Sequence, residues 1–346
     1  MTHQVKESAD PAEARSGGGA AFAELANRYR PELQLHCYRM LGSLEDAEDL
    51  VQETLLRAWR KRMSFEGRSA LRTWLYRIAT NLCLDYLERM PPARQKATAA
   101  DPGGATPPAT SIRWLQPFPD QILDDLVSSE ATPDMVVVAK ETIELAFMVA
   151  IQHLPPRQRA VLILRDVLGW SAKDTAAQLG GTVASVNSAL QRARPVLKRR
   201  LPEHRLEWQG TTDVSEDERQ VLQRYMAAIE RADSAALAAV LRKDARAGQR
   251  AGAGGHTGPE PLWVEGRDAI ITAWAPLLQH THDAELRLRP TRSNRQPAVA
   301  TYLRMSGDDR LEAFALTVLR IDGGGVAEVA TFAPDTFPAF GLPSTL

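Results

Sequence analysis

Two successive glycines, Gly180 and Gly181, interrupt a helical pattern in SAKDTAAQLGGTVASVNSALQRARPVLKRR, residues 171–200. A glycine pair favours a tight turn, so the stretch predicts two short helices joined at the glycines, the arrangement of a helix-turn-helix. The sequence contains no acidic residue between Thr182 and Arg200. That absence favours a polyanion partner, because solvated helix faces usually mix both signs of charge. An ordinary helical hairpin with a solvated basic end is the alternative.

The second of these helices has two different faces. The predicted core stripe consists of Val183, Val186, Leu190, Ala193 and Leu197. The opposite arc carries small or hydrogen-bonding side chains with bases toward its end: Ala184, Ser185, Ser188, Gln191, Arg192 and Arg199. A helix that enters the major groove needs such a profile, because small residues allow close approach and amide or guanidinium groups reach base edges.

The ends of this helix carry further signals. Thr182 is predicted to be its N-cap and to offer the helix N-terminus to a phosphate. Pro195 lacks a backbone N–H, so we expect the helix to bend or stop near Arg194.

The net charge of −1 conceals strong segregation. Residues 151–205 carry ten Lys and Arg against three acids, a net charge of +7, and residues 57–77 carry seven bases against Glu66, a net charge of +6. Residues 99–144 carry two bases and eight acids, a net charge of −6, and residues 206–346 carry fifteen bases and nineteen acids, a net charge of −4. Two basic segments are thus separated by an acidic stretch, which again favours a polyanion partner.

Length and composition bound the class of protein. A chain of 346 residues predicts two or three domains, and no apolar run reaches the roughly 18 residues of a membrane span. Residues 1–20 are polar, so we expect a disordered leader and a cytoplasmic protein. Cys37 and Cys83 lie in helix-like apolar patterns, which favours buried thiols over a redox pair or a metal site.

Two helical domains are expected in the first two thirds of the chain. Residues 21–92 follow helical spacing, with a break before Ser43, which is predicted to cap the next helix with Asp46 as a capping-box partner. Residues 93–134 are a Pro/Gly/Ala-rich linker that contains the apolar run IRWLQPFPDQILDDL. This run is either a short local cluster or a docking segment that packs on a neighbouring domain. Residues 135–204 are again helical and end in the two glycine-linked helices.

The last third predicts a different architecture. Residues 213–335 contain three helical patterns and then four strand-like runs, AELRLRP, AVATYLRM, EAFALTVLRI and VAEVATF. The turn sequences SGDD and DGGG join the last three runs, as in β-hairpins. We therefore expect an α+β domain with a meandering antiparallel sheet, followed by an apolar tail at residues 336–346 that packs against the helical domains.

Two separated stretches resemble one family. Residues 43–89, SLEDAEDLVQETLLRAWRKRMSFEGRSALRTWLYRIATNLCLDYLER, resemble region 2 of bacterial sigma factors, and residues 154–194, LPPRQRAVLILRDVLGWSAKDTAAQLGGTVASVNSALQRAR, resemble region 4. The chain is identified as a member of the extracytoplasmic-function (ECF) sigma factors. GRDAIITAWAPLL and DGGGVAEVATFAPDTFPAFGLP resemble the SnoaL-like extension of some members. The resemblance implies a multidomain fold: two all-α domains, then an α+β SnoaL-like cone.

The resemblance also implies partners and contact residues. Region 2 is implied to bind the β′ clamp of core RNA polymerase, and region 4 the β flap. The residues implied for the polymerase contact are Asp46, Asp49, Gln52 and Glu53. The alternative is a solvated acidic face near a helix N-terminus.

Promoter DNA is the second implied partner. Melting of the −10 element requires groups that hold a single strand and an extruded base. The −10 candidates are Arg68, Ser69, Arg72, Thr73, Arg77 and Asn81, whereas the spacing of Trp74 with its apolar neighbours favours a core role. The −35 candidates are Thr182, Ser185, Asn187, Ser188, Gln191, Arg192 and Arg194.

The SnoaL-like part is expected to regulate rather than catalyse. An enzyme of this kind needs an acid/base pair facing a pocket, and the candidates are His280, His282, Asp283 and Tyr302. The histidines fall at a helix end and a strand start, which is typical of surface positions. No nucleophile motif, metal spacing, phosphate loop or cofactor signature is present. We therefore expect no enzyme activity and no cofactor, and consider a small-molecule ligand a candidate partner for an apolar pocket in the cone.

Two other functions compete with this interpretation. A one-component helix-turn-helix regulator with a ligand-sensing domain leaves residues 21–92 unexplained. A SnoaL-type enzyme with helical additions leaves both basic segments unexplained. Binding to core RNA polymerase distinguishes a sigma factor from both.

Overall fold

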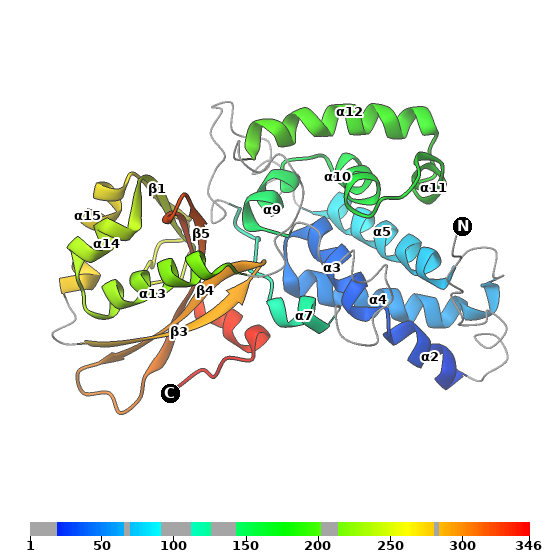
Figure 1. The fold of residues 1–346 in the computed structure, drawn as a ribbon. Helices are drawn as coiled ribbons and strands as arrows, with labels where there is room; N and C mark the ends of the chain where they lie inside the picture. The colour runs from blue at the N-terminus through cyan, green and yellow to red at the C-terminus, as the bar shows by residue number, and fades with distance from the viewer. Residues whose placement is uncertain (1–18, 66–69, 91–111, 126–142, 202–213, 280–283) are drawn as a thin grey trace. The chain divides into compact units, whose positions relative to one another are not determined.

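The computed structural model describes residues 19–65, 70–90, 112–125, 143–201, 214–279 and 284–346 (Figure 1). The chain separates into two compact units. The first unit is formed by Met1–Arg94 with Pro155–Ala193, and the second by Gln95–Leu154 with Arg194–Leu346. Each unit therefore combines segments that are distant in the sequence.

The described part of the first unit is helical. Its elements are α2 (Gly19–Asn27), α3 (Arg30–Leu41), α4 (Leu44–Lys61), the 3-10 turn η1 (Arg62–Ser64), α5 (Leu71–Arg89), α10 (Pro156–Leu162), the π-helical turn η3 (Ile163–Val167), α11 (Ala172–Gln178) and the first part of α12 (Val183–Arg200). The predicted break before α4 is present, since Gly42 has φ 75° and the Ser43 hydroxyl accepts a hydrogen bond from the Asp46 N–H at 3.1 Å.

The core of the first unit lies between α3, α4 and α5. Cys37 and Cys83 are free thiols buried in it, as the sequence predicts. The Trp74 ring lies 5.2 Å from that of Phe65 and 6.4 Å from that of Phe22, so Trp74 belongs to an aromatic cluster of the core.

Helix α10 packs on this bundle through one buried arginine. Arg159 donates a hydrogen bond to the Met40 carbonyl at the end of α3, and burial lowers the pKa of Arg159 to about 9. The ring of Trp170, which precedes α11, lies 5.7 Å from that of Tyr76 on α5. The helix-turn-helix is thus joined to the bundle by buried polar and aromatic contacts.

The second unit combines linker segments with a sheet domain. Its elements, besides the end of α12, are α7 (Asp120–Asp125), α9 (Leu145–Gln152), α13 (Glu216–Glu230), α14 (Ser234–Val240), β1 (Leu241–Gln249), β2 (Leu262–Glu265), α15 (Arg267–Gln279), β3 (Ala284–Ser293), β4 (Gln296–Met305), β5 (Glu312–Asp322), β6 (Gly325–Phe332) and the 3-10 turn η6 (Pro334–Phe340).

The sheet differs from the expected antiparallel meander. The four predicted strands β3 to β6 do pair antiparallel, but the full strand order is β2-β1-β6-β5-β4-β3 and β1 pairs parallel with β6. The sheet is therefore mixed. The sequence of β1, LRKDARAGQ, does not predict a strand, because charged residues recur through it. In the structure some of these residues form ion pairs, such as Arg246 with Glu328 at 3.2 Å.

Helices α13, α14 and α15 cover one face of this sheet (Figure 1). Their apolar side chains, among them Tyr225, Leu237 and Ile270, form one buried cluster with Val299 and Leu319 of the sheet. This cluster forms the core between the helices and the sheet, where the sequence predicts an apolar ligand pocket.

The edge strand β3 is protected against pairing with another chain. The Leu288 N–H donates to the Glu230 carboxylate at 2.9 Å, and Pro290 has no N–H to offer. Near its end, Ser293 forms a bridge with Pro119 of the linker. These three features block the free edge, which would otherwise be a template for strand addition.

None of the helices in the described ranges is both long and apolar enough to cross a membrane.

Candidate nucleic-acid and protein interfaces

The turn between α11 and α12 has the geometry that the two glycines predict. Gly180 has φ 62°, a left-handed conformation that glycine adopts without strain. The Gly181 N–H donates to the Ala176 carbonyl at 2.9 Å, and this bond closes α11 with a Schellman motif. At its other end α11 is capped by Ser171, which accepts from the Asp174 N–H at 3.0 Å.

Helix α12 begins with a reciprocal cap. The Thr182 hydroxyl accepts from the Ser185 N–H at 3.1 Å, and the Ser185 hydroxyl accepts from the Thr182 N–H at 3.1 Å. The Ser185 hydroxyl also donates to the Thr182 carbonyl at 2.7 Å. Both side chains are exposed, but their hydrogen bonds already serve the start of the helix.

The two predicted faces of α12 are present with one exception. Val186, Leu190 and Ala193 are buried, whereas Val183 is 44% exposed, because it is the first residue of the helix and lies ahead of the packed stripe. The exposed candidates for base contact and their flanking residues are Asn187, Ser188, Gln191, Arg192 and Arg194.

Pro195 does not stop the helix. Helix α12 continues to Arg200, so of the two outcomes expected near Arg194, a bend or a stop, the stop is wrong. Proline removes the hydrogen bond to the carbonyl four residues earlier, that of Gln191. Gln191 and Pro195 both lie on the exposed face, where water can hydrate that carbonyl. The basic residues Lys198 and Arg199 therefore extend the same helix.

On α5, one of the predicted DNA contacts serves the core. The Arg72 guanidinium donates to the Glu32 carboxylate at 2.6 Å, and the Tyr76 hydroxyl donates to the same oxygen at 2.7 Å. Glu32 is fully buried, and the Arg72 side chain is only 16% exposed. Arg72 thus holds a buried carboxylate in the bundle.

The other −10 candidates on α5 face outward. Arg77 and Asn81 are exposed and Thr73 is half-buried, at intervals of four residues along one side of the helix. Arg68 and Ser69 lie outside the described residues. Met63 on η1 precedes Arg68 and Ser69 in the chain, and its side chain is 75% exposed. The apolar residues lose their helical spacing at Met63, so no sequence pattern indicates this exposed side chain.

The acidic surface of α4 is offset from the predicted one. The Asp46 carboxylate accepts from the Tyr86 hydroxyl at 2.6 Å, and Glu53 forms an ion pair with Arg57 at 2.6 Å. Asp49 and Gln52 are exposed. Two exposed acids on the same side, Glu45 and Glu48, are missing from the predicted set. Glu45 lies four residues before Asp49 and Glu48 four residues before Gln52, and this helical spacing is the signal that would have found them.

The catalytic candidates in the sheet domain do not form a site in the described residues. Tyr302 is fully buried, its hydroxyl donates to the Pro343 carbonyl at 3.0 Å, and its ring lies edge-on to Phe337 at 5.3 Å. Burial raises the pKa of Tyr302. His280, His282 and Asp283 lie outside the described residues. Tyr302 therefore anchors the C-terminal tail.

The turn of the β3–β4 hairpin binds the linker. We call residues 293–296 the hairpin tip and residues 112–125 the docking segment. Asn294 and Arg295 both have left-handed φ, 56° and 57°, as in a type I′ turn. The Asn294 side chain accepts from the Phe118 N–H at 2.7 Å and donates to the Ile143 carbonyl at 2.8 Å, while its N–H donates to the Phe118 carbonyl at 2.9 Å.

Two further side chains of the tip complete this contact. The Arg295 N–H donates to Asp120 at 2.8 Å, and its guanidinium donates to Asp124 at 2.5 Å. The Gln296 side chain accepts from the Leu145 N–H at 2.9 Å. Leu145 is the first residue of α9, so a side chain of the sheet domain caps a helix that precedes the helix-turn-helix.

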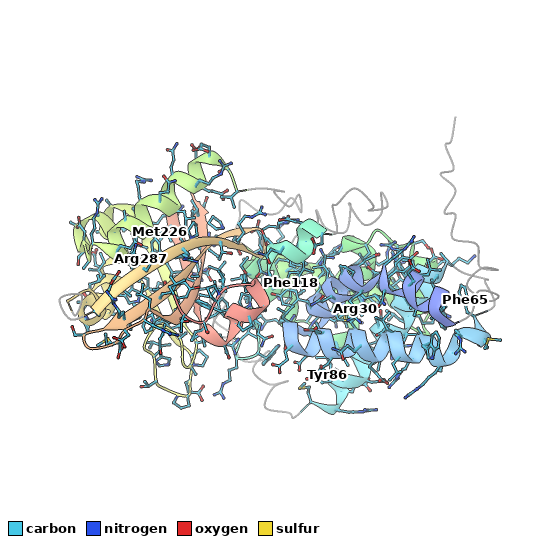
Figure 2. All side chains as sticks on the ribbon, turned by 90° about the horizontal axis from the view of Figure 1, so that it is seen from below. Arg30, Phe65, Tyr86, Phe118, Met226 and Arg287 are labelled. Atoms are coloured by element: carbon cyan, nitrogen blue, oxygen red, sulfur yellow. The ribbon has the colours of Figure 1, made fainter. Side chains whose placement is uncertain are left out.

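The large apolar side chains at four positions of the docking segment are buried. Ile112, Leu115, Phe118 and Leu123 are each exposed by 2% or less, and Figure 2 shows Phe118 beside the end of the sheet. Arg250, after β1, donates to the Leu115 carbonyl. The apolar run of the linker is thus packed on the sheet domain within the second unit.

Three family models match the chain in succession. Sigma-70 region 2 matches residues 25–90, Sigma-70 region 4 matches residues 144–195, and a SnoaL-like domain matches residues 222–329. These are the two helical segments and the sheet domain described above.

Known proteins match all or part of this organisation. The ECF RNA polymerase sigma factor SigG of Mycobacterium tuberculosis is 42% identical over 344 residues, which cover 97% of this chain and 87% of that protein. The ECF RNA polymerase sigma factor SigW of Bacillus subtilis is 29% identical over 188 residues, 54% of this chain and 92% of that protein. The crystal structure of the Mycobacterium tuberculosis extracytoplasmic function sigma factor SigJ has a similar fold, with a TM-score of 0.58, 22% identity, and coverage of 94% of this chain and 99% of that one. The expected fold and family are therefore confirmed, and the chain belongs to the ECF RNA polymerase sigma factors with a C-terminal SnoaL-like domain.

Proposed function

We propose that the exposed face of α12 recognises the −35 element while α5 holds the melted −10 element. As a sigma factor, the chain binds RNA polymerase and promoter DNA. The exposed stripe Ser188, Gln191 and Arg192 supports the first role, since hydroxyl, amide and guanidinium groups read base edges. Arg77 and Asn81 support the second, together with Arg68 and Ser69 of the preceding segment.

The acidic face of α4 supports a contact with the β′ clamp of the polymerase. Its outward side chains are Glu45, Glu48, Asp49 and Gln52. Asp46 and Glu53 contribute through their partners Tyr86 and Arg57, which fix the helix and its charge pattern. Region 4 is proposed to bind the β flap of the polymerase. With both contacts made, the two proposed DNA-binding faces would lie on one promoter. This function places the protein in the cytoplasm.

The observation that carries this function is the presence of both exposed faces, on α5 and α12, in a chain that matches regions 2 and 4. Run-off transcription with core RNA polymerase on candidate promoters tests it. We expect specific transcripts from the wild type and their loss in the double variant Gln191→Ala/Arg192→Ala. Transcription that persists in this variant contradicts the assignment of α12.

We further propose that the SnoaL-like domain regulates the sigma factor by holding the linker. Asn294 supports this role, since one side chain binds the backbone of two linker segments, at Phe118 and Ile143. A regulatory role rather than catalysis is also supported by Tyr302, whose hydroxyl is bound to the tail.

The variant Asn294→Ala tests the regulatory proposal. Loss of the side-chain hydrogen bonds to Phe118 and Ile143 should free the docking segment and change promoter-dependent transcription. Truncation after residue 205 removes the whole domain and should change it in the same direction. If neither change alters transcription in either direction, the SnoaL-like domain does not regulate through the linker.

A further inference from the structure

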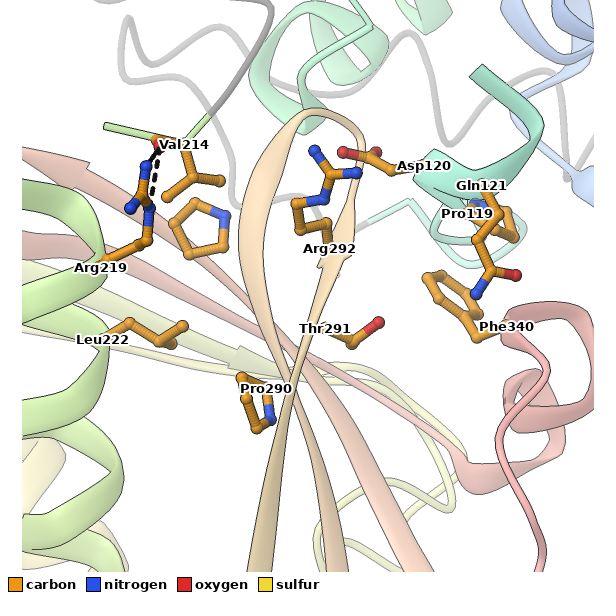
Figure 3. Close-up of a pocket in the computed structure, with 11 residues that line it drawn as sticks. Pro119, Asp120, Gln121, Val214, Arg219, Leu222, Pro290, Thr291, Arg292 and Phe340 are labelled. Carbon is orange, nitrogen blue, oxygen red and sulfur yellow. Dashed lines mark hydrogen bonds between the residues drawn. The ribbon is translucent and has the colours of Figure 1, made fainter. Parts of the chain in front are cut away.

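A cavity of about 540 Å3 lies beside the edge strand β3. Its walls come from Pro119 and the start of α7, Val214 and the first turns of α13, the β3–β4 hairpin and η6 (Figure 3). Sites for small molecules typically measure about 300–1,000 Å3. Because the docking segment supplies part of the wall, the cavity has this form only while the linker is bound.

Most of the lining is apolar. The apolar residues that line the cavity are Pro119, Val214, Leu222, Pro290, Pro297 and Phe340. Proline rings have no N–H, and none of these side chains carries a polar group. Such walls favour the apolar body of a ligand.

Three charged side chains line this cavity, and two of them are cationic. Arg219 on α13 and Arg292 on β3 line it, with side chains 58% and 37% exposed. Asp120 also lines it, but its Oδ1 accepts from the Arg295 N–H and its Oδ2 is enclosed, 3.9 Å from the Arg295 guanidinium. Figure 3 shows the Asp120 and Arg292 side chains pointing toward each other.

Each of the two lining arginines has a protein partner and further donors. The Arg219 guanidinium donates to Glu216 at 2.6 Å and to the Val214 carbonyl, and Arg292 donates to Asp124. A guanidinium has five N–H donors, so it can bind a second carboxylate beside the first.

We propose that this cavity binds an amphipathic monocarboxylic acid, whose apolar body lies on the proline, leucine and phenylalanine walls and whose carboxylate binds Arg219 or Arg292. This inference rests on the proposed regulation through the linker. The bound acid contacts the docking segment and the SnoaL-like domain at once, so it stabilises the docked linker. A ligand that binds one state shifts the equilibrium toward that state.

Fatty acids of six to twelve carbons, below their micelle concentrations, are the probes for the full-length chain. Calorimetry measures binding, and hydrogen exchange measures protection of the docking segment. We expect octanoate to bind and to slow exchange at the Phe118 and Leu145 amides, whose acceptors lie on the hairpin tip. Octylamine and 1-octanol, with the same apolar body and no negative charge, should bind at least about tenfold more weakly.

Two matched variants test the carboxylate site. Arg219→Gln should weaken octanoate binding by about tenfold, whereas Arg224→Gln, an exposed arginine on the same helix that does not line the cavity, should leave it unchanged. Arg292→Gln should weaken binding as well. Since Arg292 also binds Asp124, exchange of the docking segment without ligand is measured for this variant.

The outcomes separate this inference from the regulatory proposal. Absence of binding by the whole fatty-acid series up to about 1 mM overturns the site, as does full affinity in both the Arg219 and Arg292 variants. An effect of Asn294→Ala on transcription would then still support regulation through the linker. Conversely, arginine-dependent binding that slows exchange supports the site even if neither Asn294→Ala nor truncation after residue 205 alters transcription, in which case the regulatory proposal fails.

Discussion

Two arginines on α5 lie in different environments that the sequence does not distinguish. Arg72 and Arg77 are five residues apart, and both belong to the basic segment that predicts DNA binding. The structure separates them through Glu32, a buried carboxylate forty positions earlier that accepts from Arg72. Exposed −10 candidates could be predicted from charge and spacing, but this buried partner could not, because a contact between distant helices leaves no local pattern.

The first prediction compares these two arginines. Arg72→Ala leaves the buried Glu32 carboxylate without its cation, so it should lower the free energy of unfolding of the first unit by about 3 kcal/mol. Arg77→Ala should change the free energy of unfolding by less than about 0.5 kcal/mol and slow promoter opening by about tenfold. Urea denaturation and the rate of open-complex formation are the measurements. Equal stability of the two variants would contradict the structural role of Arg72.

The second prediction concerns His36, whose ring bonds to the Thr80 hydroxyl at 3.0 Å. Burial, with Arg39 and Arg72 nearby, lowers the pKa of His36 to about 3 from a usual value of 6.5. The folded state therefore keeps His36 neutral, while the unfolded chain takes up a proton as the pH falls through about 6.5. Stability of the first unit is lost below that pH, by about 2 kcal/mol between pH 6.5 and pH 5.

Urea denaturation at a series of pH values tests this dependence. His36→Gln removes the titrating ring and should flatten the stability profile between pH 5 and pH 7 in comparison with the wild type. A slope that is the same in both proteins would assign the acid sensitivity to other groups.

At the scale of elements, the helices and the strands β3 to β6 could be predicted from the sequence, whereas β1 and β2 could not. Periodic apolar residues and caps such as Ser43 mark the helices, and alternation marks β3 to β6. The first two strands lack these signals. β2 has four residues, and β1 places charged side chains against β6, so their pairing depends on neighbours that are distant in the sequence. The continuation of α12 through Pro195 likewise depends on tertiary structure, because the Gln191 carbonyl, which loses its hydrogen bond, lies on the exposed face of the helix.

The third prediction tests the turn of the helix-turn-helix. Gly180 has φ 62°, and no neighbouring atom lies within 4 Å of the place that a Cβ would take, so Gly180→Ala adds backbone strain without a clash. It should destabilise the helix-turn-helix by about 1 kcal/mol, and Gly180→Asn by less, because asparagine tolerates this conformation better. Thermal unfolding followed by circular dichroism compares the two. If the asparagine variant is the less stable one, strain at Gly180 is not the cause.

At the scale of the whole molecule, the binding of the linker by the SnoaL-like domain was not predictable in its details. The apolar run IRWLQPFPDQILDDL, residues 112–126, left docking and a local cluster equally open. The hairpin tip recognises main-chain atoms of Phe118 and Ile143, and such atoms are the same in every sequence. The turn residues Asn294 and Arg295 lie between two predicted strands, but their partners lie more than 150 positions away and no charge or apolar pattern indicates them.

The fourth prediction follows the linker during assembly. If RNA polymerase needs a free linker, adding core enzyme to the full-length chain should speed hydrogen exchange at the Phe118 and Leu145 amides. Asn294→Ala should show fast exchange at Phe118 before the core enzyme is added, because its acceptor is lost. Exchange that stays slow in the wild-type complex would mean that the linker remains docked during transcription.

Asn294 also limits the distance that the chain between Phe118 and Ile143 can span. Phe118 and Ile143 are 25 residues apart in the sequence, yet one asparagine side chain holds both. Drawn out, that stretch would span about 85 Å at roughly 3.4 Å per residue. Opening this clasp, together with the contacts that Arg295, Gln296 and Arg250 make with the same linker segments, would release slack between the segment proposed to melt the promoter and the segment proposed to read it upstream.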